Sequence, residues 1–150
     1  MTGAGTPTTV SPMVLLDTHV WIWLVEGTPG TISERVLARL ESAAGRSALR
    51  VSALSAWEVA ILTRKRRLQL TRDPASWVSE AITRRGITEV RLNSAVAVAA
   101  ALLPTPAPED PADRFLLATA FSNGWTLATR DADIISYAAV AGISVLDARN

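Results

Sequence analysis

Short apolar runs alternate along this chain with longer segments whose apolar residues recur at helical spacing. The runs predict strands at residues 13–16, 50–53, 87–92, 126–129 and 143–146. The segments between them predict helices at residues 18–25, 33–44, 55–68, 74–85, 94–103, 110–123 and 132–141. Short apolar strands joined by helices are typical of a parallel sheet that is covered on both faces. The sequence therefore predicts an α/β three-layer sandwich, with a mostly parallel central sheet flanked by helices.

The chain of 150 residues has the size of one domain. No internal repeat and no linker divides it. Residues 1–12 are rich in Thr, Gly and Pro, and we expect them to form a flexible N-terminal tail. Residues 13–150 should form a single domain.

Four acidic residues follow predicted strands or begin predicted helices, namely Asp17, Glu58, Asp113 and Asp131. The carboxyl ends of parallel strands lie along one edge of a sheet, and ligands collect there. Carboxylates gathered in one cleft repel each other unless a cation neutralises them, and Mg²⁺ prefers oxygen ligands. The pattern predicts a metal-dependent active site.

Helix capping is the alternative explanation for each acid taken singly. Glu58 would complete a Ser-x-x-Glu capping box that begins at Ser55. Asp110 followed by a proline is a common helix start, and Asp113 would then favourably meet the helix dipole. Asp17 and Asp131 are plausible N-caps as well. Capping alone, however, would leave several carboxylates repelling each other at one edge of the sheet.

Composition narrows the class of protein. The formal net charge is +1, and the chain contains no cysteine, which excludes disulfides, thiol nucleophiles and cysteine-bound zinc. The start of the chain lacks the pattern of a signal peptide, and no apolar run is long enough to span a membrane. We expect a soluble, cytoplasmic protein that does not associate with membranes. No glycine-rich phosphate loop is present, which argues against a P-loop enzyme.

Four segments resemble the motifs of PIN-domain ribonucleases, specifically the VapC-type toxins of toxin–antitoxin pairs. The segments are LLDTHVW at 15–21, SALSAWEVAI at 52–61, DPADRFLLATA at 110–120 and LATRD at 127–131. They occur in the family's order and with similar gaps between them. The resemblance implies a PIN-like fold and a metal-dependent endoribonuclease that acts as a toxin.

The resemblance also implies roles for individual residues. The PIN acidic quartet would be Asp17, Glu58, Asp113 and Asp131, binding Mg²⁺ or Mn²⁺ and activating water for attack on RNA. Asp17 and Asp113 would be the principal metal ligands, and Thr129 would place a hydroxyl near the metal. A small VapB-like antitoxin would inhibit the enzyme by laying a tail with Arg or Lys across the acidic cleft.

Basic side chains are candidates for contacts with RNA phosphates. The candidates are Arg64, Lys65, Arg66, Arg67 and Arg114, and Thr129 is a further candidate for RNA contact. The run at 64–67 is equally typical of a solvated helix face, and Arg114 could instead pair with Asp110 or Asp113. The chain's one histidine, His19, either packs in the first helix or transfers a proton.

Two other classes of protein are alternatives to a ribonuclease. A haloacid-dehalogenase-type phosphatase would need a second Asp two residues after Asp17, where this chain has His19. A catalytically inactive PIN-like module that binds RNA or a partner stays open. A homodimer is expected because Trp21, Ile22 and Leu24 cannot all face one core from a single helix.

Overall fold

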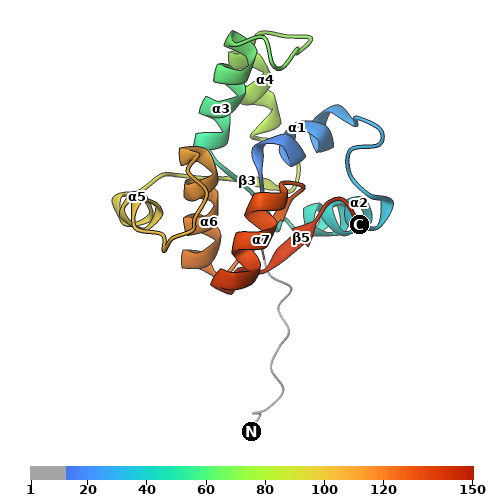
Figure 1. Ribbon diagram of the computed structural model, residues 1–150. Coiled ribbons are helices and arrows are strands. Elements are labelled where there is room, and N and C mark those ends of the chain that lie inside the picture. Colours follow the sequence, from blue (N-terminus) through green and yellow to red (C-terminus); the bar gives the residue numbers. More distant parts are fainter. Residues whose placement is uncertain (1–12) are drawn as a thin grey trace, which may run out of the picture.

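A computed structural model describes residues 13–150, and the tail expected at residues 1–12 lies outside the described residues. The described part contains five strands (Figure 1), which are β1 (Val14–Leu16), β2 (Leu49–Ser52), β3 (Ile87–Val90), β4 (Thr126–Thr129) and β5 (Val145–Asp147). Its seven helices are α1 (Thr18–Glu26), α2 (Glu34–Gly45), α3 (Ala53–Arg64), α4 (Pro74–Ala81), α5 (Ser94–Ala101), α6 (Pro111–Asn123) and α7 (Ala132–Ala141). None of these helices combines the length and apolar character that crossing a membrane requires.

The strands form one sheet in the order β3-β2-β1-β4-β5, and every neighbouring pair is parallel. The chain builds the sheet outward from β1 to β3 and then returns to add β4 and β5 on the other side of β1. The direction of winding therefore reverses between β1 and β4. Open α/β sheets bind ligands beyond the carboxyl ends of the strands at such a reversal. The topology therefore predicts a ligand-binding site in the crevice beyond Leu16 of β1 and Thr129 of β4.

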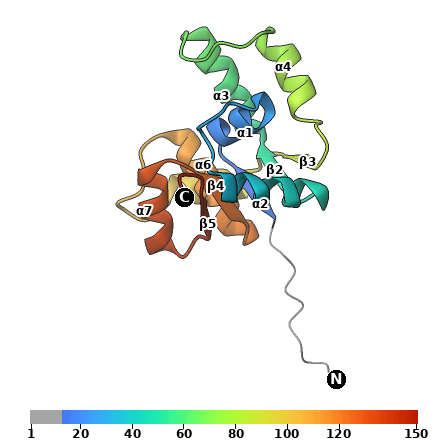
Figure 2. The same ribbon diagram turned by 90° about the vertical axis from the view of Figure 1, so that its right-hand side faces the viewer.

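Separate apolar clusters cover the two faces of the sheet. Along β1, Val14 and Leu16 belong to one cluster and Leu15 to the other, because successive side chains of a strand point to opposite faces. Helices α1 to α4 contribute to the first cluster, and α6 and α7 contribute to the second. Figure 2 shows α2 and α7 on opposite sides of β4 and β5. The predicted three-layer sandwich is confirmed, with a sheet that is entirely parallel.

Helices α3 and α4 form a hairpin that extends beyond the sheet, with their connecting segment at the end farthest from the strands (Figure 1). Helix α4 ends at Ala81, earlier than the sequence pattern predicts, and the Ala81 carbonyl accepts a hydrogen bond from Trp21 Nε1 at 3.4 Å. Gly86 lets the start of β3 pass close to α2. It has a φ of +88°, and a Cβ there would lie 2.4 Å from the Ala44 carbonyl oxygen.

Helix α1 packs on two sides within one copy of the chain. Its neighbouring residues Trp21 and Ile22 are 0% and 3% exposed. Trp21 meets Trp77 of α4 edge-on at 5.0 Å between ring centroids, so α4 supplies a second surface for α1 to pack against. The apolar residues of α1 are therefore no reason to expect a homodimer, and that argument from the sequence is wrong. The homodimer itself stays a prediction.

Candidate active site

Asp17 lies at the carboxyl end of β1 and begins α1. Its Oδ1 accepts a hydrogen bond from the Val20 N–H at 2.8 Å, so Asp17 is the N-cap of α1. Its Oδ2 accepts a hydrogen bond from the Thr129 hydroxyl at 2.5 Å. Asp17 is only 8% exposed, and burial raises the pKa of its carboxyl although both hydrogen bonds act to lower it. Capping is therefore correct for Asp17, but it accounts for only one of the two oxygens.

Thr129 is the last residue of β4 and is 0% exposed. Its hydroxyl oxygen also accepts a hydrogen bond from the Asp131 N–H at 3.0 Å. Thr129 thus links the acid that follows β1 to the acid that follows β4. A side chain without exposed surface does not touch a bound nucleic acid, so the expectation that Thr129 contacts RNA is wrong.

Asp131 begins α7. Its Oδ1 accepts the N–H groups of Asp133 at 2.9 Å and of Ile134 at 3.0 Å, which confirms the N-cap predicted from the sequence. No hydrogen bond reaches Oδ2 from any other described residue. Asp131 lines the cleft at the winding reversal, and this oxygen is free to bind a ligand there.

The capping box predicted for Ser55 and Glu58 is wrong. Strand β2 leads directly into α3, so the helix begins at Ala53 and its N-cap is Ser52, whose hydroxyl accepts the Leu54 N–H at 3.1 Å. This early start places Glu58 in the second helical turn, too far from the N-terminus to cap it. A capping role therefore does not explain the acid at this position.

Glu58 instead lines the cleft and accepts a hydrogen bond from the Thr18 hydroxyl. The Ser55 Oγ lies 2.9 Å from the same Thr18 oxygen, so the three side chains form a short chain of hydrogen bonds between α1 and α3. Burial raises the pKa of the Glu58 carboxyl, and the negative charges of Asp110 and Asp17 add to this rise.

Asp110 and Asp113 lie at the start of α6. Asp110 is the N-cap, because its Oδ1 accepts the Asp113 N–H at 3.2 Å, as the sequence predicts. The Asp113 carboxylate, by contrast, accepts no hydrogen bond from the other described residues. Its pKa is raised to about 7, first by burial and then by the charges of Asp110, Asp131, Glu58 and Asp17. Asp113 therefore experiences the repulsion of every other acid at this edge of the sheet.

The acids meet in one cleft of about 460 Å³, which is lined by Asp17, Glu58, Asp110, Asp113 and Asp131. Such a donor set consists only of carboxylate oxygens, and this suits a hard divalent cation. Within residues 13–150, however, no three acidic or histidine side chains converge tightly enough to form a finished metal site. The residues fit a divalent cation by their chemistry, and their side chains need to rotate to bind it.

A second wall of the same cleft consists of His19, Trp23 and Arg130. His19 and Trp23 are one helical turn apart on α1, with ring centroids 5.6 Å from each other. Arg130 lies between β4 and α7, donates to the Thr31 carbonyl at 2.9 Å and places its guanidinium carbon 5.9 Å from the Trp23 ring centroid. No sequence pattern places Trp23 or Arg130 beside the acids, although Arg130 directly precedes Asp131.

The basic run that is predicted to contact RNA phosphates lies apart from the acids of the cleft. Arg64, Lys65, Arg66 and Arg67 are all exposed at the far end of the α3–α4 hairpin, outside the cleft. This position suits a contact with RNA as well as a solvated helix end, so their role stays a prediction.

Arg114 makes neither of the ion pairs suggested by its sequence neighbours. Its guanidinium donates to three backbone carbonyls, at 2.9 Å to Ala100, 2.8 Å to Pro108 and 3.0 Å to Ala101. These bonds tie the loop before α6 to the end of α5. The structure therefore gives Arg114 a role in holding this loop, and the expected pairing with Asp110 or Asp113 is wrong.

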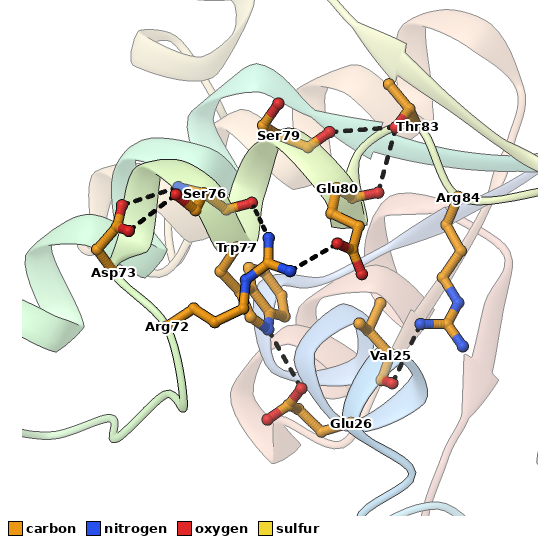
Figure 3. Close-up of polar contacts among 10 residues, drawn as sticks. All are labelled: Val25, Glu26, Arg72, Asp73, Ser76, Trp77, Ser79, Glu80, Thr83 and Arg84. Atoms are coloured by element: carbon orange, nitrogen blue, oxygen red, sulfur yellow. Dashed lines mark hydrogen bonds and ion pairs between the residues drawn. The ribbon is translucent and has the colours of Figure 1, made fainter.

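Helix α4 supports α1 from outside the cleft (Figure 3). Trp77 Nε1 donates to the Glu26 carboxylate at 3.2 Å, and Arg84 donates to the Val25 carbonyl at 3.4 Å. Both contacts hold the C-terminal end of α1. Trp77 of α4 and Arg84, which follows α4, thus both hold the end of the helix that carries His19 and Trp23.

The chain is similar to known proteins in sequence and in fold. The PIN domain family profile matches residues 14–140. Ribonuclease VapC22 from Mycobacterium tuberculosis is 36% identical over 124 residues, which cover 83% of this chain and 91% of the relative.

Two solved structures share the fold over nearly their whole length. DNA-bound VapBC from Salmonella typhimurium matches with a TM-score of 0.66 and 19% identity, covering 91% of this chain and 98% of that chain. A toxin–antitoxin complex from Klebsiella pneumoniae matches with a TM-score of 0.57 and 19% identity, covering 89% and 95% of the two chains. With the profile match and the identity to VapC22, these findings show that the chain belongs to the PIN-domain family.

Proposed function

We propose that this protein is an endoribonuclease that hydrolyses RNA phosphodiester bonds with Mg²⁺ or Mn²⁺ bound in the acidic cleft. The observation that carries the proposal is the accumulation of negative charge at the winding reversal. Five carboxylates line the cleft, and their repulsion helps to raise the pKa of Asp113 to about 7. A bound divalent cation removes this repulsion. The ribonuclease name of the VapC22 relative supports the same activity.

The acidic quartet, Asp17, Glu58, Asp113 and Asp131, would hold the cation. When bound, the cation stabilises the negative charge that develops on the phosphate and promotes ionisation of the attacking water. One metal or two would fit this chemistry equally well. Asp110 lies at the rim of the cleft, and its Oδ1 already accepts the hydrogen bond that caps α6.

The protein's own hydrogen bonds prepare two of these ligands. Thr129 and the Val20 N–H hold both oxygens of Asp17, and the Thr18 hydroxyl holds one oxygen of Glu58. Asp113 accepts no such bond from the described residues, so its carboxylate is free to turn toward a cation. The site therefore combines hydrogen-bonded acids at the start of α1 and on α3 with an acid on α6 whose carboxylate accepts no hydrogen bond from the described residues.

We further propose that the protein is the toxin of a VapBC-type pair and that a small antitoxin inhibits it. The support is the identity to VapC22 and the toxin–antitoxin complex among the structures that share the fold. An inhibitor that presents Arg or Lys to the cleft would neutralise the same carboxylates as the metal. We also keep the homodimer as part of this proposal, although the apolar residues of α1 give no reason to expect it.

RNA cleavage by the purified protein tests the enzymatic proposal directly. Single-stranded RNA of mixed sequence should be cut with Mg²⁺ or Mn²⁺, and EDTA should stop the reaction. The alternative, an inactive PIN-like binding module, predicts metal-independent RNA or partner binding and no cleavage with either ion. Asp113→Asn serves as the control for a contaminating nuclease, because it should cleave far more slowly than the wild type.

A further inference from the structure

The cleft has a non-acidic wall that the proposed chemistry leaves without a role. His19 and Arg130 are exposed and Trp23 is partly exposed, and both His19 and Arg130 lie near the indole of Trp23. Of the described residues that line the cleft, Arg130 alone is an arginine or lysine. A flat aromatic surface and a cation thus lie beside five carboxylates in one cavity.

We propose that Trp23, together with His19 and Arg130, forms a subsite that stacks an unpaired RNA base next to the bond being cleaved. The inference rests on the proposed function, because it takes RNA as the substrate of the same cleft. Trp23 supplies the stacking surface. Arg130 supplies charge for the phosphate that adjoins the base.

A base can stack on this face of the indole once the Arg130 side chain moves aside. Stacked atoms lie about 3.5–4.0 Å apart, whereas the Arg130 guanidinium carbon is 5.9 Å from the Trp23 ring centroid. The guanidinium therefore lies over the ring, but farther from it than a stacked group would. Its anchor is a single hydrogen bond to the Thr31 carbonyl, so a small rotation of this exposed side chain admits a base. The His19 ring lies 5.6 Å from the Trp23 ring between centroids, tilted by 43°, and bounds the subsite on α1.

Electrostatics explains why such a subsite is needed. RNA is a polyanion, and a cleft lined by carboxylates repels it everywhere except at a bound cation. Stacking attracts a base without regard to the charge of the backbone and is tolerant of sequence. The wall of Trp23 and Arg130 would therefore hold the substrate where the acids would otherwise reject it. Bases paired in a duplex are not accessible for this contact, so the subsite selects single strands.

Trp57 provides a matched control. It is more exposed than Trp23, at 56%, and lies on α3 beside Glu58, but it does not line the cleft. If any exposed tryptophan assists RNA binding, Trp57→Ala and Trp23→Ala will have equal effects. If the cleft wall is the subsite, only Trp23→Ala will weaken binding.

The experiment measures equilibrium binding of a fluorescent single-stranded RNA in Mg²⁺, with every variant made in an Asp113→Asn background that does not cleave it. A second RNA of the same length carries abasic sites and so keeps the phosphates without the bases. Trp23→Ala should weaken binding of the normal RNA about tenfold, within the range for loss of one stacked base, and change binding of the abasic RNA little. Trp23→Phe keeps a ring and should lose only part of the affinity, which also controls for damage to the fold.

Arg130→Gln should weaken binding of both RNAs and flatten the salt dependence, since its contact is with the phosphate backbone. Equal affinity of Trp23→Ala and the Asp113→Asn parent for the normal RNA would overturn the subsite. An equal loss on the abasic RNA would overturn it too. If Trp23→Ala weakens only the binding of an antitoxin, the surface belongs to a protein partner and the RNA subsite is wrong.

These outcomes are separate from failure of the proposed function. A wild-type protein that binds RNA through Trp23 but never cleaves it would refute the nuclease and retain the subsite. A wild-type protein that cleaves RNA and is indifferent to Trp23 would refute only the subsite.

Discussion

The hydroxyl of Thr129 donates a hydrogen bond of 2.5 Å to Oδ2 of Asp17, across 112 positions of sequence. Asp17 directly follows β1 and Thr129 is the last residue of the neighbouring parallel strand β4, since Leu16 of β1 pairs with Ala128 of β4. The same hydroxyl accepts the Asp131 N–H. One buried side chain thus orients the carboxylate of Asp17 and holds the backbone at Asp131, before any cation binds.

Thr129→Val should destabilise the metal-free protein by about 1–3 kcal/mol, because it leaves a buried carboxylate oxygen and a backbone N–H without their partner. Thr129→Ser keeps the hydroxyl and should retain most of the stability. Urea denaturation in EDTA measures both. Equal stability of the valine and serine variants would show that the hydroxyl does not hold Asp17.

Asp113 should make the metal-free fold less stable as the pH rises. Its pKa is about 7 in the folded protein against an ordinary value of 3.8, so folded Asp113 binds its proton more tightly than unfolded Asp113. The resulting stabilisation is complete below about pH 4, declines between pH 4 and 7, and is absent above pH 7. The pKa values of Asp17 and Glu58 are also raised and act in the same direction.

Urea denaturation in EDTA between pH 4 and 8 tests this dependence, with Asp113→Asn as the comparison. The variant should lose part of the slope, since an amide does not titrate. Mg²⁺ affinity should change in the opposite direction, rising with pH through about 7, because cation and proton compete for the same carboxylate. An identical pH slope in the variant and the wild type would contradict the raised pKa of Asp113.

The sequence was sufficient to predict the order of elements and the edge at which the acids meet. Both follow from local patterns, namely apolar runs, caps and the position of each acid relative to a strand. The N-caps at Asp17, Asp110 and Asp131 were predicted for the same reason, since a cap depends on its immediate neighbours.

Features that depend on packing between distant segments were missed or wrong. The capping box at Ser55 fails because β2 runs directly into α3, and the burial of both Trp21 and Ile22 depends on α4. The wall of Trp23 and Arg130 joins residues separated by most of the chain. No local sequence pattern predicts that Arg130 lies over the indole of Trp23 or that Arg114 donates to three backbone carbonyls.

The basic run at the far end of the α3–α4 hairpin should contribute to RNA binding through phosphate contacts. Lys65→Gln with Arg67→Gln should lower the slope of log affinity against log salt by about 0.7 for each lost contact with a single strand. Arg66 is left unchanged, because its φ of +60° makes a substitution there affect the backbone. The control neutralises Arg39 and Arg46, two exposed arginines of α2 and its C-cap. If the slope of log affinity against log salt is the same in the hairpin variant and the wild type, the basic run is only a solvated surface.

An antitoxin that occupies the acidic cleft should depend on the same carboxylates as the metal. Glu58→Gln with Asp131→Asn should weaken antitoxin binding as well as catalysis, because both changes remove charge that a basic side chain would meet. Glu34→Gln with Glu41→Gln makes the same change of charge at exposed positions of α2 and should leave binding unaltered. Isothermal titration with the cognate antitoxin compares the affinities of the two double variants. The antitoxin is sought in the reading frame beside this gene. Equal affinity in both double variants would mean that inhibition does not use the cleft.

Asp17→Asn tests the central claim, that the acids at the winding reversal form a metal-dependent ribonuclease site. Asn remains a good N-cap and removes a buried charge, so the fold should persist with unchanged or higher thermal stability in EDTA. Single-turnover cleavage of RNA, measured across a titration of Mg²⁺ or Mn²⁺, should fall at least about 100-fold at every metal concentration. Full metal-dependent cleavage by a well-folded Asp17→Asn protein would contradict the account.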